Sequence, residues 1–242
     1  MDEMKINLIV KSDWRIGSLK SIFFNALKKL NDVDVDFLWF VKRQHHMYSE
    51  IREEAVNQSR SHGSEGGRRS FVTMTYTPQH IANFFLKKAN ASGQPLDQLK
   101  LMKLVYIAYG WSLALKNKKL FLESIEAWQH GPVVPSIYHE FKHFGKAPIL
   151  EPALCVEFDE EDGLSVYTPE IPESDQETIF ILDKVWAAYR RFSGWDLRNK
   201  THEDNSPWAK VFKAGQRGVP MNDDDIRSHY IDRIRRYIEN AA

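Results

Sequence analysis

The segment that most constrains what this chain can fold into is 96–145. Its first half predicts an amphipathic helix, because apolar residues recur at steps of three and four and so share one face. These residues are Leu101, Leu104, Val105, Ala108 and Leu115. Three aromatic residues in the same run, Tyr106, Tyr109 and Trp111, widen the apolar surface beyond one stripe. We therefore expect this helix to contact several neighbouring elements.

The second half of the segment predicts another helix, which follows a Gly-Pro corner. Pro135 suits the first turn of that helix, because the missing N–H of proline has no partner to lose there. Gly145 is placed to end it. Its buried side is expected to contain Ile137, Tyr138, Phe141 and Phe144. The two helices would then meet at a rigid corner that carries Trp128 and His130.

These residues resemble the Panacea domain, the SocA-like antitoxin family. The resemblance rests on a Trp-x-His-Gly-Pro-Val-x-Pro-x-x-Tyr pattern at 128–138, on the start of the domain at 74–89, and on a Thr-His and a Pro-Trp pair farther along. It covers residues 74 to 238. The family-motif residues, with structural or partner-binding roles, are Trp128, His130, Gly131, Pro132, Val133, Pro135, Tyr138, Thr201, His202, Pro207 and Trp208.

The resemblance implies an antitoxin of a toxin–antitoxin system, which neutralises a toxin encoded nearby through direct protein–protein binding. It also implies an association with prophages and, as a second partner, a cellular protease to which the toxin is delivered. No cofactor is implied. Two alternatives stay open: a DNA-binding transcriptional regulator and a His-dependent hydrolase.

The expected fold is mainly α (α+β), with a β-hairpin embedded in a helical domain. Apolar residues alternate at Leu154, Val156 and Phe158 and again at Leu164 and Val166, with a Gly-containing turn between the two runs. That alternation predicts two short paired strands. The single cysteine, Cys155, falls within the first strand and is interpreted as a small apolar residue rather than a nucleophile.

Helix starts are marked along the rest of the domain. Pro78 and Pro207 follow Thr77 and Ser206, which suit the preceding cap position. A capping box is predicted at Ser174, with Glu177 reaching back to it. Asn222 and the three aspartates after it favour the start of a final helix. The helix that begins at Pro207 is expected to extend to Lys213.

Three regions are expected along the chain. Residues 1–58 predict a small βαβ-like extension, residues 59–73 a Ser/Gly-rich linker, and residues 74–242 the Panacea-type domain. The extension is either an accessory module or upstream sequence attached by an early start. Its regular hydrophobic periodicity favours the module.

Composition narrows the class of protein further. Lys+Arg and Asp+Glu are equal at 33 each, so no overall basic charge indicates nucleic acid as a partner. No apolar run approaches the roughly 20 residues of a membrane span, and the N-terminus lacks a signal-peptide pattern. We therefore expect a cytoplasmic protein without a membrane partner. Local basic residues, Arg68 and Arg69 in the linker and a C-terminal group at 233–236, keep nucleic acid as an alternative partner.

Nothing in the sequence predicts a catalytic or metal site. His139 and His143 are four residues apart on a predicted helix, but no third ligand accompanies them and the spacing differs from His-Glu-x-x-His. His130 is expected to donate to a carbonyl and fix its turn, and Thr201 to cap a helix. No carboxylate is placed to form an acid–base pair with a histidine. The chain is therefore interpreted as a binding protein and not an enzyme.

Overall fold

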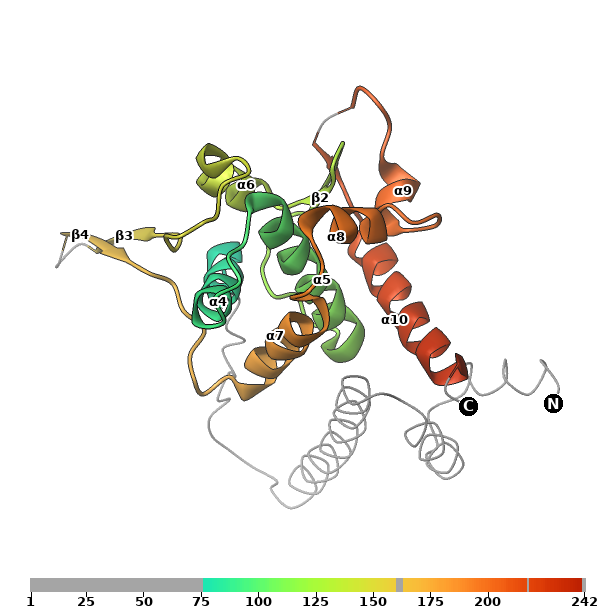
Figure 1. Cartoon of the computed structure of the whole chain (residues 1–242), viewed down its shortest axis with the longest axis horizontal. Coiled ribbons are helices and arrows are strands. Elements are labelled where there is room, and N and C mark those ends of the chain that lie inside the picture. Colours follow the sequence, from blue (N-terminus) through green and yellow to red (C-terminus); the bar gives the residue numbers. More distant parts are fainter. Residues whose placement is uncertain (1–75, 160–162, 217, 241–242) are drawn as a thin grey trace, which may run out of the picture. The chain divides into compact units, whose positions relative to one another are not determined.

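The computed structural model describes residues 76–159, 163–216 and 218–240 (Figure 1). The predicted N-terminal extension and linker lie outside these residues. From Tyr76 to Asp232 the described chain belongs to one structural unit. Its helices are α4 (Pro78–Ala91), α5 (Gln98–Lys116), α6 (Pro135–Phe141), α7 (Gln176–Tyr189), α8 (Gly194–Thr201), α9 (Pro207–Val211) and α10 (Asp223–Asn240), with a 3-10 turn η1 at Lys142–Phe144.

Two small antiparallel sheets accompany the helices. One has the strand order β2-β1-β5 and is made of β1 (Glu126–Trp128), β2 (Gly131–Val133) and β5 (Val219–Pro220). The other is the hairpin of β3 (Cys155–Asp159) and β4 (Gly163–Tyr167). The prediction of a mainly α fold with an embedded β-hairpin is therefore confirmed.

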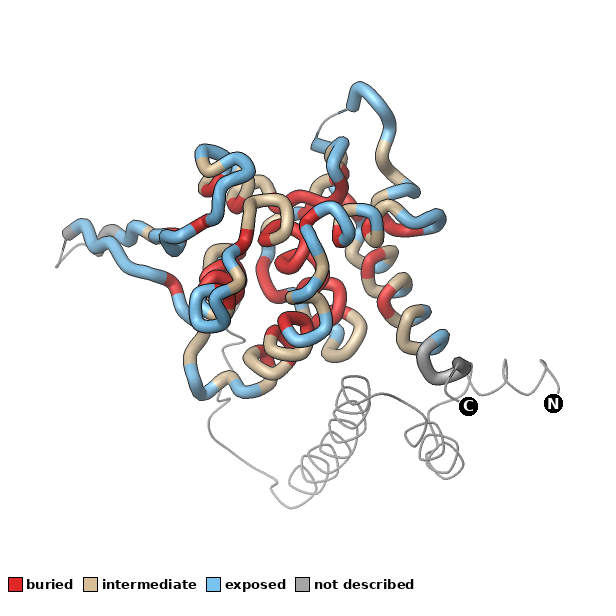
Figure 2. The backbone as a smooth tube through the Cα atoms, in the orientation of Figure 1, coloured by how far each residue is buried: buried red, intermediate tan, exposed pale blue. Residues whose placement is uncertain are grey.

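Helix α5 is the central element of the described unit. Every residue from Leu101 to Leu113 is buried, and α4, α6, α7, α8 and β2 all pack on it (Figure 2). The predicted contact with several neighbours is confirmed. The prediction of a single apolar face is wrong, because neighbours cover α5 from all directions, and Leu115 is only half-buried beyond this core.

A glycine allows α10 to approach α5 closely. A Cβ atom on Gly110 would lie 2.1 Å from Cε2 of Tyr230, so only a residue without a side chain fits beneath that ring. The Tyr230 ring also contacts Trp111 edge to face, with their centroids 5.2 Å apart. The aromatic residues that widen α5 in the sequence thus serve to seat α10.

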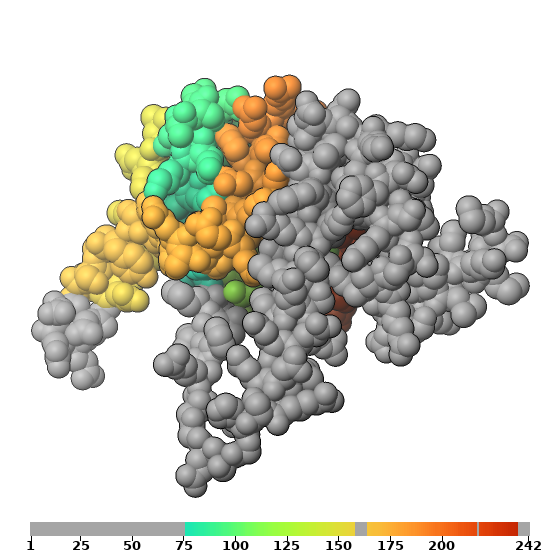
Figure 3. Space-filling model, turned by 90° about the horizontal axis from the view of Figure 1, so that it is seen from below, coloured from blue at the N-terminus to red at the C-terminus, as the bar shows by residue number. Residues whose placement is uncertain are grey.

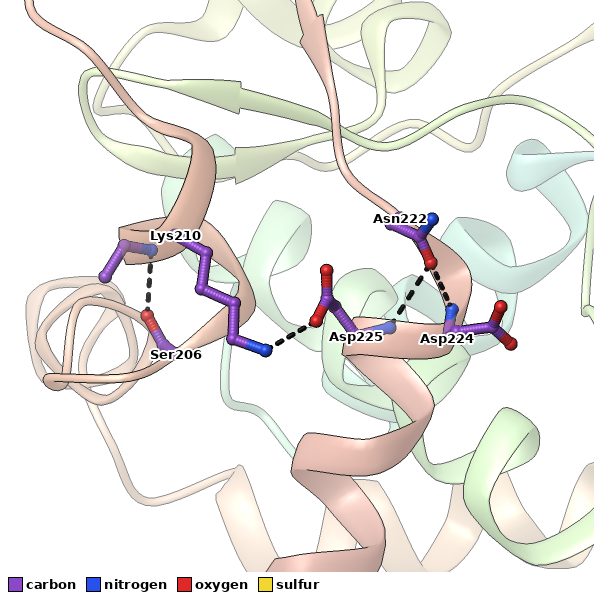
Figure 4. Close-up of polar contacts among 6 residues, drawn as sticks. Ser206, Lys210, Asn222, Asp224 and Asp225 are labelled. Atoms are coloured by element: carbon purple, nitrogen blue, oxygen red, sulfur yellow. Dashed lines mark hydrogen bonds and ion pairs between the residues drawn. The ribbon is translucent and has the colours of Figure 1, made fainter.

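Most predicted helix starts are correct. Pro78 begins α4 and Pro207 begins α9, where the Ser206 hydroxyl accepts from the Ala209 amide. Asn222 Oδ1 accepts from the Asp224 amide at the start of α10, and the Lys210 ammonium pairs with Asp225, which links α9 to α10 (Figure 4).

The capping box at Ser174 is wrong. Helix α7 is capped by Asp175, whose carboxylate accepts from the Thr178 amide at 3.0 Å. The same carboxylate also accepts from the Tyr76 hydroxyl at 2.6 Å, so a tertiary contact favours Asp175 as the cap.

Two predicted helix ends are also corrected. Helix α9 ends at Val211, because Phe212 already has extended backbone angles. Helix α6 ends at Phe141, and Phe144 lies half-buried in the 3-10 turn that follows. None of the described helices is both long and apolar enough to cross a bilayer.

Candidate functional site

The family-motif residues begin in a tight β-hairpin rather than in a simple corner between two helices. Strands β1 and β2 pair antiparallel with Trp128 opposite Gly131, so Gln129 and His130 form the turn. Gly131 has φ +99, a conformation that side chains disfavour. Pro132 lies in β2 at the sheet edge, where a missing N–H is tolerated. The predicted Gly-Pro corner is therefore corrected to a strand pair with β5 on the other side of β1.

A buried lysine lies beneath this hairpin. Lys103 on α5 is fully buried, and its ammonium donates to the Pro132 carbonyl at 2.9 Å. Burial, together with the smaller effect of the positive charge of Arg198, lowers the pKa of Lys103 to about 7. The sequence pattern did not predict a role for Lys103 at this site. The available signal is a lysine inside a run that is otherwise apolar on every side of its helix.

The perturbed lysine makes stability depend on pH. The unfolded chain holds the Lys103 proton up to about the ordinary value of 10.5, whereas the folded chain releases it near 7. Between these values the unfolded state binds more protons, so stability should rise with pH by up to about 1.4 kcal/mol per unit. We expect Lys103→Met to remove this slope. Urea unfolding of both full-length proteins at pH 7, 8 and 9 measures it.

The comparison isolates Lys103, because every other titrating group is present in both proteins. Cys155 is one of these: burial raises the pKa of its thiol, which gives a slope of the opposite sign. Equal slopes in the two proteins would show that Lys103 keeps its proton in the folded state.

The end of α8 covers the other side of Gly131. The Thr201 hydroxyl donates to the Arg198 carbonyl at 2.8 Å, and Nδ1 of His202 lies 2.7 Å from the same oxygen. A carbonyl can only accept, so Nδ1 carries the proton. Burial lowers the pKa of His202, which favours the neutral ring. The Thr201 hydroxyl therefore satisfies a carbonyl in the last turn of α8, whereas the C-cap residue of this helix is His202.

Two tryptophans lock the hairpin to α9 and α6. Trp208 Nε1 donates to the Trp128 carbonyl at 2.8 Å, and the Trp208 ring lies against His202 with centroids 3.7 Å apart. Trp128 Nε1 donates to Glu126 at 2.7 Å, and its ring packs on Tyr138 with centroids 4.8 Å apart. The indole N–H groups are therefore engaged within the fold.

The structure brings the motif residues together from β1, β2, α6, α8 and α9. Val133 and Pro207 are buried, and Pro135 begins α6. His130 is exposed: its ring lies 5.9 Å from that of Trp195, whereas the carbonyl contact expected of His130 is made by His202. His139 and His143 lie apart from this cluster, on α6 and η1.

The polar groups of the motif cluster are largely engaged in contacts within the fold. Neither motif histidine contacts a carboxylate within residues 76–159, 163–216 and 218–240. No three His, Cys, Asp or Glu side chains of that described part converge on a point where a metal ion could bind. Lys103 and Trp208 donate to carbonyls of β2 and β1, which ties α5 and α9 to the hairpin, whereas the Thr201 bond lies within α8.

Comparison with known proteins identifies the same region. The family described as "Antitoxin SocA-like, Panacea domain" matches residues 101–209, a stretch that contains all the motif residues. "Antitoxin SocA" of Caulobacter vibrioides (strain NA1000 / CB15N) is 32% identical over 140 residues, which cover 56% of this chain and 72% of that protein. No solved structure matches the chain. The chain belongs to the SocA-like antitoxin family and carries its Panacea domain.

Proposed function

We propose that this protein is an antitoxin that neutralises a cognate toxin, encoded close to it, by binding the toxin directly. The observation that carries the proposal is the 32% identity to Antitoxin SocA. The geometry supports binding over catalysis, because the polar atoms of the motif are used to hold the fold together. The motif then supplies a rigid scaffold, and recognition of the toxin falls to exposed residues outside the motif.

Neutralisation by binding means that the antitoxin covers the working surface of the toxin. A few large side chains usually carry most of the affinity of such an interface. Tyr109, Trp195 and Trp208 are three large aromatic candidates for such anchors, but Tyr109 is buried and Trp208 is half-buried in the motif cluster. Only Trp195, on α8, is exposed, at 55% of its surface. Tyr109 is therefore a core residue and cannot contact a partner, and Trp208 belongs to the rigid motif cluster.

Co-expression with the protein of the adjacent reading frame tests the proposal. We expect the neighbour alone to stop growth and this chain to restore growth when the two are made in comparable amounts. The two proteins should also co-purify, because covering a surface requires a lasting complex. Rescue should disappear once the neighbour is in clear molar excess.

The dose dependence separates binding from catalysis. An enzyme would restore growth at a small fraction of the toxin's amount and would leave no complex to purify. Such a result would contradict neutralisation by binding and would support the His-dependent hydrolase. Failure to restore growth at any dose would contradict the assignment of this neighbour as the cognate toxin.

A further inference from the structure

The β3–β4 hairpin carries an apolar face that nothing in the described unit covers. Val156 pairs with Val166, so both side chains lie on the same face, and Leu164 joins them because it is two residues from Val166 along β4. These three side chains are 61%, 59% and 69% exposed. The opposite face carries Glu157 and Ser165, with Cys155 and the partly exposed Tyr167 nearer its base. The hairpin therefore has one aliphatic and one more polar face, as a sheet does when its aliphatic face packs against another surface.

The root of this hairpin is held firmly. Asn83 on α4 is buried, and its amide accepts from the Ala153 N–H at 2.8 Å and donates to the Ala153 carbonyl at 3.0 Å. It also donates to the Pro169 carbonyl at 3.1 Å. One side chain thus clamps the chain just before β3 and just after β4. The hairpin leaves the helices from a fixed base and projects beyond them (Figures 1 and 3).

The strands beyond that base lack the partners that usually stabilise such an element. The sheet consists of β3 and β4 alone, and no other described strand pairs with either outer edge. A two-stranded hairpin is only marginally stable in water unless its apolar face is packed. Exposed strand edges also readily accept a strand from another chain.

The charge of this region indicates the kind of partner. Residues 147–183 contain no Lys, Arg or His but eleven acidic residues, in a chain whose total charge is zero. These are Glu151, Glu157, Asp159, Glu160, Glu161, Asp162, Glu170, Glu173, Asp175, Glu177 and Asp183. The rest of the chain therefore carries the compensating positive charge.

Among the described residues, the ion pairs of this acidic segment lie outside the hairpin. Glu170, Glu177 and Asp183 pair with Lys87, Lys116 and Lys88 of α4 and α5. On the hairpin, Glu157 is exposed, and no described basic side chain pairs with it. Four more acidic residues follow it at 159–162. The charge of Glu157 is thus not paired by any described side chain and is available to a partner.

We propose that the β3–β4 hairpin is the surface on which the toxin docks, and that the toxin meets it with a basic surface containing an apolar patch. This inference rests on the proposed antitoxin function. Burial of the three aliphatic side chains supplies affinity, and the acidic residues select a basic partner and speed its association.

The alternative docking surface is the exposed Trp195. Its ring already contacts the edge of His130 and the guanidinium of Arg198, at 5.9 Å in each case. Trp195 therefore has neighbours that stabilise it in the free protein, whereas no described residue covers the apolar face of the hairpin. The two surfaces make different predictions, which one set of variants can separate.

The test uses full-length variants and the purified, tagged protein of the adjacent reading frame as the probe. Two variants remove the proposed contacts: Val156→Ser with Val166→Ser, and Glu157→Lys. Leu122→Ser and Asp204→Lys are the matched controls, because Leu122 is 75% exposed and Asp204 is an exposed acid outside the hairpin. We expect each hairpin variant to bind at least tenfold more weakly and each control to bind like wild type. Melting temperatures should stay close to wild type throughout.

Wild-type binding should also weaken as salt is raised, and Glu157→Lys should reduce that salt dependence. Wild-type affinity in both hairpin variants would overturn the inference while leaving the antitoxin function intact, especially if Trp195→Ala abolished binding. Self-association of the free protein that the valine variant abolishes would show that a second copy covers this face, which also overturns the inference. Absence of binding by the wild-type protein itself would contradict the proposed function instead.

Discussion

Gly131→Val is expected to lower the free energy of unfolding by roughly 3 kcal/mol or more. Two effects combine at this position. A valine must adopt φ +99, and its Cβ would lie 2.7 Å from Lys103 Nζ, 2.8 Å from His202 Cε1 and 3.0 Å from Thr201 Oγ1. The lysine is fully buried and the other two groups are held by the Arg198 carbonyl, so none of them can move away easily. Urea unfolding of the full chain measures the loss.

Gly93→Val is the matched control. Gly93 also has a positive φ, +63, but a Cβ there would meet nothing within 4 Å. It should therefore show the backbone strain alone, about 1–2 kcal/mol. The difference between the two variants reports how tightly the motif packs around Gly131. Equal losses would show that the motif cluster is loose enough to absorb a side chain, which contradicts its role as a rigid scaffold.

The sequence predicted that the motif residues would lie close together, but it did not predict the β1–β2 hairpin that brings them together. The spacing of Trp128, Gly131 and Pro135 indicated a sharp change of direction before a helix, and α6 does begin at Pro135. Strands β1 and β2 are only three residues long, and β5 is two. Alternation cannot be recognised over so few residues, and the pairing of β1 with β5 joins segments about 90 positions apart. This pairing is a tertiary event without a local signal.

Tertiary contacts also explain the other differences. The choice of Asp175 over Ser174 as a cap depends on the Tyr76 hydroxyl, which no local pattern reveals. Helix α8 was not predicted because it is short and mostly polar, with Gly194 and Leu197 among its few buried residues. Gly194 is there because a Cβ would lie 3.0 Å from the Lys100 amide at the start of α5. Helix α8 thus owes its position to packing on α5 rather than to an apolar stripe.

Lys103 shows the same limit for the candidate site. A lysine in a helix is ordinarily expected on the side of the helix that faces solvent. Lys103 lies in the core because neighbouring elements cover every side of α5. Its partner, the Pro132 carbonyl, belongs to the edge strand β2 and lies 29 positions away along the chain, so no local pattern reveals the contact. Lys103 and the family motif are therefore recognised as one site only from the folded structure, in which they are in contact.

Tyr109→Ala is expected to be among the most damaging single substitutions outside the motif. Tyr109 is buried in α5, its ring lies 4.7 Å from that of Phe121, and its hydroxyl donates to Asp223 at 2.9 Å at the start of α10. Removing a buried aromatic ring costs about 3–5 kcal/mol. We therefore expect Tyr109→Ala to lose cooperative unfolding or a large part of its stability, and to lose rescue in co-expression for that reason.

Two further variants show whether the loss arises in the core. Tyr109→Phe keeps the ring and removes only the hydroxyl, so it should cost about 1 kcal/mol and retain rescue, since Asp223 still pairs with Lys119. Trp195→Ala removes an exposed ring and should change the free energy of unfolding by less than about 1 kcal/mol. A Tyr109→Ala protein that stays as stable as wild type yet fails to bind the toxin would contradict the assignment of Tyr109 to the core. The Tyr109 ring is enclosed by α5, Phe121 and α10. Tyr109→Ala should therefore lose both stability and rescue, and it should be the only one of the three variants to lose both.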